Sequence, residues 1–332
     1  MWDVGDATPR DLGRRPACER FAASLISPSA GGAMPMIDFN SVDLPAPLLL
    51  LGANSECGFI RLRWLAHNER RETTMDLGIS GLRVLVTAGA AGIGLEIARA
   101  FTREGARVHV CDVDENALAA LSRSDPALTW TRCDVAQRPE VAALFADAAQ
   151  RLGGLDCLVN NAGIAGPTGR VEEIDPEEWD RCIAIDLTGQ FNCVRLAVPY
   201  LRKSTNASVV NVSSQAGRHG FALRTPYAAA KWGVIGLTRS LAIELGPDKI
   251  RVNALLPGIV AGDRQKRVLT AKAQARGISF AEMEKFAFSF TSIKEYVTPQ
   301  QLADFVVFVS SPRGRTISGQ SLSVCGDTNM LS

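Results

Sequence analysis

From residue 82 onward, short apolar runs rich in β-branched residues alternate with stretches that have the periodicity of amphipathic helices. This alternation is typical of βαβ units, in which a crossover helix returns each strand parallel to the one before it. The runs are apolar at nearly every position, which indicates strands covered on both faces. We therefore predict a single α/β domain built on a doubly wound parallel sheet of about seven strands. The expected strands are 84–87, 108–111, 128–133, 157–160, 208–212, 251–255 and 321–324.

Helices are expected in the intervals between these strands. The first, over 93–104, places its apolar residues largely on one side and ends at Gly105, a residue suited to the position after a helix. Proline at the start of later helical segments fits the first turn, where a missing N–H costs nothing. The other expected helices are 139–152, 176–202, 226–245 and 299–309.

Residues 1–75 have no sustained period of either kind and contain scattered Pro, Gly and Ser. We interpret them as a poorly ordered extension, with Met75 as a candidate initiator and 76–332 as the catalytic domain. Early acidic residues and the short apolar stretch near Phe21 do not fit a signal peptide. A functional arm that packs on the domain or on a partner is the alternative.

Charge and cysteine use narrow the possible partners. The chain has 36 Lys and Arg against 35 Asp and Glu, which gives no overall attraction to nucleic acid or membrane surfaces. No apolar stretch is long enough to span a bilayer. The eight cysteines form no CxxC pair, and with only three histidines we expect reduced core thiols, no metal site and a cytoplasmic protein.

The first expected strand runs into a glycine-rich loop that opens a helix. Glycines there permit a tight turn and let the backbone approach a pyrophosphate at the helix N-terminus. The second strand ends at Asp112, whose carboxylate can bind ribose hydroxyls and would repel a 2′-phosphate. The pair predicts a dinucleotide site that prefers NAD, with NADP less suitable. A plain strand-to-helix turn and a solvated Asp are the alternative interpretation.

Several motifs that follow in order resemble those of the short-chain dehydrogenase/reductase family, in its compact single-domain branch. The resemblance covers about residues 82–326 and implies a Rossmann-type fold. The glycine loop is similar to TGxxxGxG, with Ala88 in place of the first glycine, and Tyr227 and Lys231 form the YxxxK motif. A spacing of 13 residues to Tyr227 identifies Ser214, rather than Ser213, as the family's catalytic serine.

The resemblance implies a role for each matching residue. The catalytic set would be Ser214, Tyr227, Lys231 and Asp186. The residues that would bind the dinucleotide are Thr87, Gly89, Gly92, Ile93, Gly94, Asp112, Asp134, Val135, Asn161, Ala162, Gly163, Tyr227, Lys231, Pro257, Gly258 and Val260.

The chemistry of the Tyr and Lys pair also follows from their spacing. Residues four apart share one face of a helix, so Tyr227 and Lys231 can act together. A phenol with its ordinary pKa of about 10 is a poor base at neutral pH. A nearby ammonium and an oxidised nicotinamide both favour the phenolate. Tyr227 can then exchange a proton with an alcohol or ketone while Ser214 binds the same oxygen.

Two positions depart from the family's pattern. Asp186 stands where the family has a catalytic Asn, and its charge would offset the effect of Lys231 on Tyr227. The segment that contains Val260 lacks the family's Thr after Pro257-Gly258, so we expect one contact to the nicotinamide amide to be lost. These departures put the rate or pH optimum in question more than the reaction class.

Substrate recognition is expected in a lid over about residues 261–297. Arg264, Lys266 and Arg267 could bind an acidic group or simply form a solvated helix face. The alternating Phe286, Phe288 and Phe290 are expected to pack in the core rather than line a pocket. His219 and Arg224 flank the expected site between Ser214 and Tyr227 and could contact substrate.

We therefore predict an NAD-dependent oxidoreductase that interconverts a secondary alcohol and a ketone. An NADP-dependent 3-oxoacyl thioester reductase is the enzymatic alternative, and a catalytically weak dinucleotide-binding sensor is the non-enzymatic one. The partners expected are a small alcohol or ketone and further copies of the chain, as a homotetramer or homodimer through the helices 176–202 and 226–245.

Overall fold

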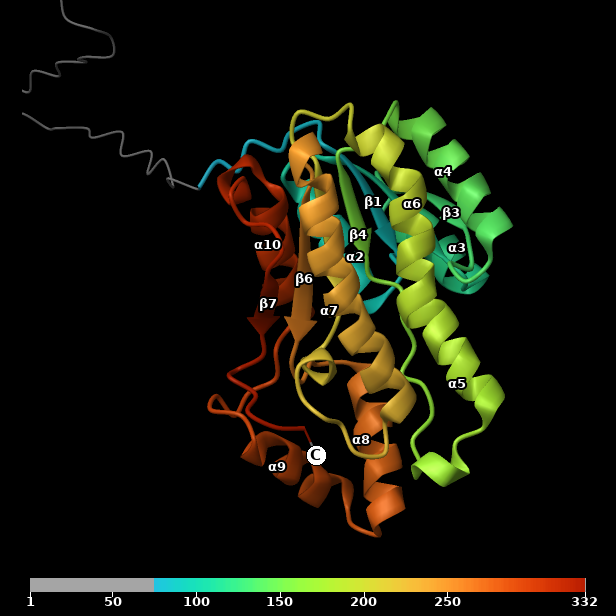
Figure 1. The fold of residues 1–332 in the computed structure, drawn as a ribbon, viewed down its shortest axis with the longest axis vertical. Helices are drawn as coiled ribbons and strands as arrows, with labels where there is room; N and C mark the ends of the chain where they lie inside the picture. Colours follow the sequence, from blue (N-terminus) through green and yellow to red (C-terminus); the bar gives the residue numbers. More distant parts are fainter. Residues whose placement is uncertain (1–74, 332) are drawn as a thin grey trace, which may run out of the picture. The chain divides into compact units, whose positions relative to one another are not determined.

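The structure, a computed structural model, describes residues 75–331. The predicted extension over 1–75 lies outside the described residues except for Met75, so its interpretation stays a prediction. The described part contains a sheet of seven parallel strands in the order β3-β2-β1-β4-β5-β6-β7. The predicted doubly wound parallel sheet is confirmed (Figure 1). The strands are β1 (Arg83–Thr87), β2 (Arg107–Asp112), β3 (Thr129–Arg132), β4 (Cys157–Asn160), β5 (Ser208–Val212), β6 (Arg251–Pro257) and β7 (Ser321–Val324).

The register across the middle of the sheet brings together the loops that matter for the site. The order reverses between β1 and β4, where Val86 pairs with Val159. At such a reversal the two adjacent crossover helices leave toward opposite faces, which opens a crevice at the carboxyl ends of the strands. Loops after β1 and β4 are therefore neighbours although they are far apart in the sequence.

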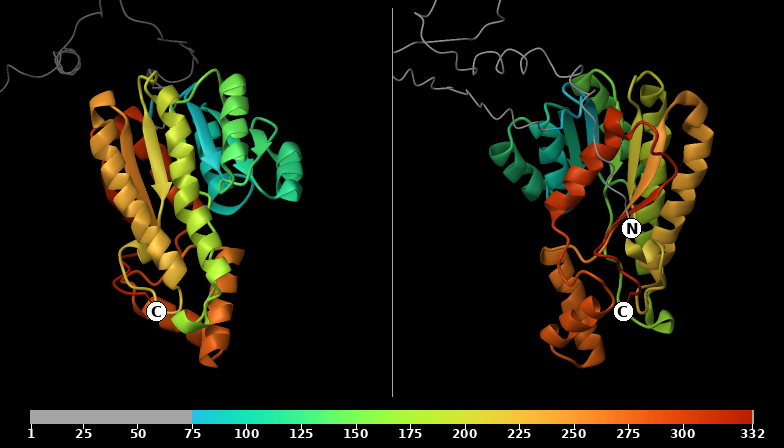
Figure 2. Two further views of the ribbon diagram at one scale, coloured as in Figure 1. Left: turned by 45° about the vertical axis from the view of Figure 1, so that its right-hand side comes forward. Right: turned by 90° about the vertical axis from the view of Figure 1, so that its left-hand side faces the viewer.

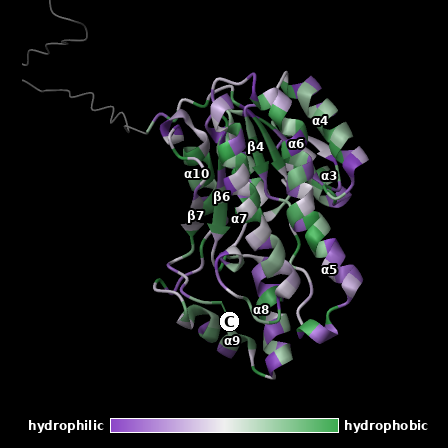
Figure 3. Cartoon of the chain, viewed as in Figure 1, coloured by the Kyte–Doolittle hydropathy of each residue, from purple (hydrophilic) through white to green (hydrophobic). Residues whose placement is uncertain are grey.

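Helices cover both faces of the sheet (Figure 2). One face carries α2 (Gly92–Arg103), α3 (Glu115–Ser124) and α10 (Pro299–Ser310), and the other carries α4 (Arg138–Leu152), α6 (Gly189–Leu201) and α7 (Thr225–Leu245). Side chains of β1 alternate between the two cores: Val84 and Val86 pack on the first face, and Leu85 packs on the second. Figure 3 shows the buried strands as hydrophobic, in agreement with the apolar runs in the sequence.

The structure corrects three expectations about helices. Helix α3, which Asp114 caps at its N-terminus, was not predicted because its apolar periodicity is short. The expected helix 176–202 is interrupted: α5 (Pro176–Ile183) and α6 are joined by a π-helical turn, Ala184–Thr188, that contains Asp186. Such turns often occur at functional sites. The segment after β6 contains α8 (Asp263–Arg276) and α9 (Phe280–Ser289), which pack on each other around Met283.

Helices α8 and α9 lie beyond the carboxyl ends of the strands (Figures 1 and 2). Both ends of the segment that carries them are held together, because Val260 forms a parallel bridge with Val297. The expected core packing of the three alternating phenylalanines is wrong. Phe286 is 38% exposed and stacks edge to face on Phe290, and Phe288 stacks in the same way on Tyr296.

Five of the six described cysteines are buried, as the sequence suggested for core thiols, and none of the six forms a disulfide. Burial raises the pKa of the Cys157 thiol to about 11. Within residues 75–331, no helix has the length and apolarity needed to cross a membrane.

Gly94 is required by the close approach of α2 to the loop after β1. A Cβ at this position would lie 2.1 Å from the Ala88 carbonyl oxygen and 2.5 Å from Asn161 Nδ2. We expect Gly94→Ala to lower the free energy of unfolding by about 1–3 kcal/mol in urea denaturation, because backbone must shift. Gly220→Ala is the control: its Cβ would meet no atom within 4 Å, and a change within about 0.5 kcal/mol is expected. Equal effects of the two substitutions would contradict the packing argument.

Candidate active site

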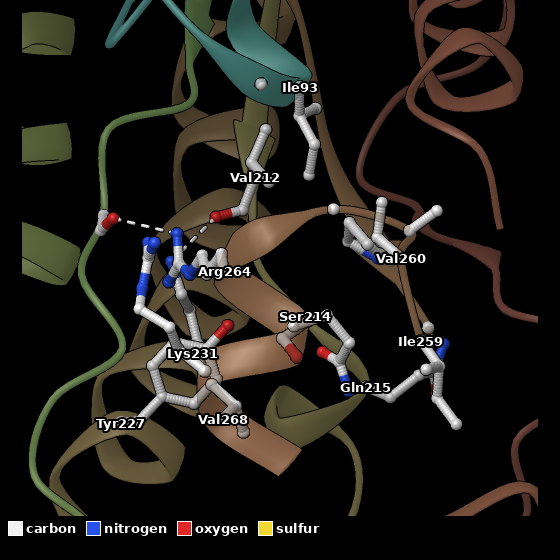
Figure 4. Close-up of a pocket in the computed structure, with 18 of the residues that line it drawn as sticks. Ile93, Val212, Ser214, Gln215, Tyr227, Lys231, Ile259, Val260, Arg264 and Val268 are labelled. Atoms are coloured by element: carbon white, nitrogen blue, oxygen red, sulfur yellow. Dashed lines mark hydrogen bonds between the residues drawn. The ribbon is translucent and has the colours of Figure 1, made fainter. Parts of the chain in front are cut away.

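A cavity of about 700 Å³ lies at the carboxyl edge of the sheet. Its walls come from the loops after β1, β2, β4, β5 and β6, and from helices α7 and α8. Figure 4 shows Ser214, Tyr227, Lys231 and Arg264 around this space, with Ile93 and Val212 at the end nearer the sheet. The crevice predicted by the strand order therefore exists and is large enough for a cofactor and a small substrate.

The loop after β1 is fixed to the loop after β4. The Thr87 hydroxyl accepts hydrogen bonds from the N–H groups of Asn161 (3.0 Å) and Ala162 (2.9 Å). In return, Asn161 Nδ2 donates to the carbonyls of Thr87 and Ala88 at 3.1 and 3.0 Å. Ala88 has a φ of +50°, a conformation that favours glycine. This explains why the resembling motif carries glycine there, and these bonds hold the alanine in place.

Asp112 lies at the end of β2 and lines the cavity. Its carboxylate accepts hydrogen bonds from the N–H groups of Ala90 (3.2 Å) and Asp114 (3.2 Å). These bonds hold the charge beside the glycine loop. A negative charge there suits ribose hydroxyls better than a phosphate.

The side chains for proton transfer come from β5 and α7. Ser213 and Ser214 follow β5, and the Ser213 hydroxyl is occupied by donation to the Lys231 carbonyl at 2.8 Å. Ser214 is half-buried and lines the cavity, where its hydroxyl also accepts from Ala216 N–H at 3.1 Å. Tyr227 and Lys231 lie on one face of α7, with Lys231 Nζ 5.5 Å from the centre of the Tyr227 ring.

Lys231 is 2% exposed and forms an ion pair with Asp186, which is fully buried. The distance from Nζ to Asp186 Oδ2 is 3.1 Å. Nζ also donates to the Val212 carbonyl at 3.1 Å, as Figure 4 shows. The other oxygen of Asp186 accepts from the Ile164 N–H at 2.6 Å. The π-helical turn therefore brings Asp186 to the lysine, as the family's pattern suggested for this position.

The wall opposite the glycine loop follows β6. Gly258 lies so close to β7 that a Cβ would approach Cys325 Cα to 2.6 Å. Pro257, Gly258 and Val260 line the cavity, and Val260 is fixed by its bridge to Val297. A side chain at position 258 would therefore push the segment after β7 away from this wall.

The predicted residues divide into two groups. Those that line the cavity are Gly92, Ile93, Asp112, Asn161, Gly163, Ser214, Tyr227, Lys231, Pro257, Gly258 and Val260. Those that do not line it are Thr87, Gly89, Gly94, Asp134, Val135, Ala162 and Asp186; of these, Thr87, Gly94 and Asp186 fix the loops and turns described above. Direct contact of Asp134 and Val135 with the adenine stays a prediction.

Among the residues proposed for substrate recognition, Arg224, Arg264 and Arg267 line the cavity, and Lys266 and His219 do not. Phe221 and Lys272 are among the further lining residues that the sequence did not point to. Lys272 follows Arg264 by eight residues on α8, a polar helix in which no apolar periodicity marks the buried face. Nothing in the sequence therefore indicates that Lys272 is buried. Its burial becomes visible only when α8 packs against the loop that contains Phe221.

Comparison with known proteins agrees with this geometry. A family model described as enoyl-(acyl carrier protein) reductase matches residues 88–327. The chain is 34% identical over 248 residues to a putative ketoacyl reductase of Streptomyces coelicolor, which covers 73% of this chain and 95% of that protein. It is 36% identical over 253 residues to trans-4-hydroxycyclohexanecarboxylate dehydrogenase of Sinomonas cyclohexanicum, which covers 73% and 90%.

A solved structure of actinorhodin polyketide ketoreductase with NADPH matches with a TM-score of 0.70 at 33% identity, over 75% of this chain and 97% of that one. The chain belongs to the short-chain dehydrogenase/reductase family. It is an NAD(P)-dependent enzyme that acts on CH–OH groups. The glycine loop, the cavity volume and the Asp112 carboxylate fit a dinucleotide, with the residues along the cavity wall available to hold it.

The Asp186 carboxylate offsets part of the positive charge that Lys231 places near Tyr227. We expect Asp186→Asn to shift the pH profile of alcohol oxidation toward lower pH, with activity kept or raised, because an amide leaves the ammonium unneutralised. Asp180→Asn, on the exposed side of α5, is the matched control and should leave the profile in place. An unchanged profile in Asp186→Asn would mean that the ion pair has no influence on proton transfer.

Proposed function

We propose that this protein is an NAD-dependent oxidoreductase that interconverts a secondary alcohol and a ketone, with Tyr227 as the general acid and base. One observation carries the proposal: Ser214, Tyr227 and Lys231 face the same cavity as the glycine loop and Asp112. A group that exchanges protons with substrate must lie within hydrogen-bond reach of the substrate and beside the hydride carrier.

The roles of the side chains follow from their positions. The Ser214 hydroxyl binds the substrate oxygen and orients it toward Tyr227. The Tyr227 hydroxyl takes the proton from the alcohol, or returns it to the carbonyl oxygen in the reverse direction. Lys231 favours the phenolate through its charge, and its Nζ is held by Val212 and Asp186. When bound, the nicotinamide accepts or supplies the hydride.

The buried position of Lys231 makes its charge effective. Because the ammonium is 2% exposed, solvent screens it less than a surface lysine. Asp186 reduces this effect without removing the lysine's hydrogen bonds. We infer that the enzyme works best at a more alkaline pH than an otherwise identical enzyme with Asn at this position.

The preference for NAD rests on Asp112. Its carboxylate is held at the ribose end of the glycine loop, and no Arg or Lys occupies positions 90, 91 or 113 to bind a 2′-phosphate. Relatives differ in this respect, since one solved structure was determined with NADPH. The site around Asp112 supports NAD for this chain.

Names of relatives indicate the range of substrates to consider. They include D-beta-hydroxybutyrate dehydrogenase of Cupriavidus necator, 32% identical over 247 residues, and a 3-oxoacyl-[acyl-carrier-protein] reductase of Thermotoga maritima, 32% identical over 252 residues. The second keeps an NADP-dependent 3-oxoacyl thioester reductase as the alternative function, against which Asp112 argues. A catalytically weak sensor protein is less consistent with three cavity-facing groups suited to proton transfer.

The decisive test is removal of one hydroxyl. Tyr227→Phe should reduce turnover at least about a hundredfold, the lower range for acid–base catalysis, while the fold and NAD affinity are kept. Turnover is followed by NADH absorbance over a panel of sugars, hydroxy acids, steroids and cyclic alcohols. Tyr200→Phe, which alters a tyrosine of α6 outside the cavity, is the matched control. Normal turnover in Tyr227→Phe would overturn the mechanism.

Cofactor choice is tested separately. We expect the wild type to favour NAD over NADP by at least about tenfold in kcat/KM, which corresponds to about 1.4 kcal/mol. Asp112→Ala should narrow this gap because it removes the repulsion toward a 2′-phosphate. Asp304→Ala, on the exposed side of α10, should leave the ratio as it is. Equal use of NADP by the wild type would refute the preference.

We also propose that the enzyme is cytoplasmic and forms a symmetric homo-oligomer, most simply a tetramer, through the faces of α5, α6 and α7. Exposed apolar side chains on these helices, Phe191, Trp232 and Ile243, support an interface there. Light scattering at micromolar concentration should give a multiple of the chain mass. A monomer under these conditions would contradict the proposal.

A further inference from the structure

The cavity wall next to Tyr227 carries two buried cations. Arg224 immediately precedes α7, and Lys272 comes from α8; each is 2% exposed and each lines the cavity. Both contact one aromatic ring: Arg224 Cζ lies 5.3 Å and Lys272 Nζ 4.0 Å from the centre of Phe221. Arg224 Cζ is also 5.1 Å from the centre of the Tyr227 ring. The cations therefore lie beside the proton-transfer group, on the wall of the same cavity.

Neither cation is neutralised within the described part of the chain. No carboxylate of residues 75–331 lies within 4.0 Å of the charged nitrogens of Arg224 or Lys272. One Arg224 nitrogen, Nη2, donates to the Ala165 carbonyl. The other two, Nε and Nη1, are buried and have no hydrogen-bond partner among these residues.

This arrangement is costly unless something binds there. Buried charged groups in proteins are normally paired, since an unpaired one loses its hydration without compensation. Burial lowers the pKa of Lys272 to about 7, with Arg224 as the second cause, and burial also lowers the pKa of Arg224. The cation–π contacts with Phe221 recover only a part of the lost hydration, about 0.5–2 kcal/mol each.

The dinucleotide does not explain these charges. Its phosphates are expected at the glycine loop and the start of α2, whereas Arg224 and Lys272 are grouped around Phe221 and Tyr227. Formation of helix α8 does not require a buried lysine either. Lys266 on the same helix is exposed, as lysines on a helix surface usually are. A negatively charged group of the substrate is the partner that fits this position.

We propose, on the basis of the proposed function, that the substrate is a hydroxy acid or oxo acid whose carboxylate binds between Arg224 and Lys272. The Nε–H and Nη1–H groups of Arg224 supply donors that the protein leaves unused. A singly charged carboxylate pairs with the charge of Arg224 and favours the protonated form of Lys272. Since Arg224 lies against Tyr227, the carboxylate and the reacting carbon belong to one compact molecule.

The test compares acids with their uncharged esters. We would measure kcat and KM for trans-4-hydroxycyclohexanecarboxylate and 3-hydroxybutyrate and for the methyl ester of each, in the wild type, Arg224→Met, Lys272→Met and Lys266→Met. The wild type should favour at least one acid over its ester at least tenfold in kcat/KM. Arg224→Met and Lys272→Met should each reduce that ratio at least tenfold, mainly through KM. Lys266→Met, the control on the same helix, should keep the ratio.

A binding measurement separates this inference from the proposed reaction. Calorimetric titration of the NAD-loaded enzyme with cyclohexanecarboxylate, which has no hydroxyl to oxidise, should show binding that weakens at least tenfold in Arg224→Met or Lys272→Met. Binding of this kind without turnover of any alcohol or ketone would support the anion site and refute the proposed function. Turnover of esters and neutral alcohols as efficient as that of the acids, with ratios insensitive to both variants, would overturn the anion site and leave the proposed function standing. Thermal unfolding of each variant establishes that it is folded.

Discussion

The parallel pairing of β1 with β4 is the constraint on which the rest of the site depends. It places the loop after β1 beside the loop after β4, and the Thr87 hydroxyl and the Asn161 amide join the two through four hydrogen bonds. A buried, irregular loop needs hydrogen-bond partners for its backbone N–H groups, because water is excluded. The buried threonine hydroxyl is the partner of two such groups and so stabilises the loop. The strained backbone of Ala88 is maintained by this frame, and the cavity opens directly in front of it.

The cation on one side of Tyr227 has an acidic partner, whereas the two cations on the other side have none within the described residues. On the side of the sheet, Lys231 is compensated by Asp186 and by the Val212 carbonyl, so its position is fixed and its charge is partly balanced. On the side of α8, Arg224 and Lys272 have no acidic partner among residues 75–331. The first arrangement suits a permanent part of the catalytic apparatus. The second suits a surface that is completed when a negatively charged molecule arrives.

Much of this architecture was accessible from the sequence because periodicity and spacing record local constraints. Buried parallel strands require nearly continuous apolar runs, which mark the central strands, and the edge strands β3 and β7 were found although they are only partly buried. The glycine loop and Asp112 follow directly from the first two strands, whereas Ser214, Tyr227 and Lys231 were identified by their resemblance to the family's motifs. The break at Ala184–Thr188 was not found, because a π-helical turn changes hydrogen bonding without changing composition. Helices α8 and α9 were missed because α8 is polar along most of its length and its few buried apolar residues pack on α9.

The cations at the cavity illustrate why recognition is harder to infer than chemistry. Tyr227 and Lys231 are four residues apart on one helix, so their cooperation is a local property of the chain. Arg224 and Lys272 come from different elements, and their shared contact with Phe221 depends on how α8 packs against the loop before α7. In the sequence, Lys272 cannot be distinguished from Lys266, yet one is buried and the other exposed. We therefore infer that specificity in this protein is set by tertiary packing around the reaction centre, and that the loss of hydration at two buried cations is the physical signal of it.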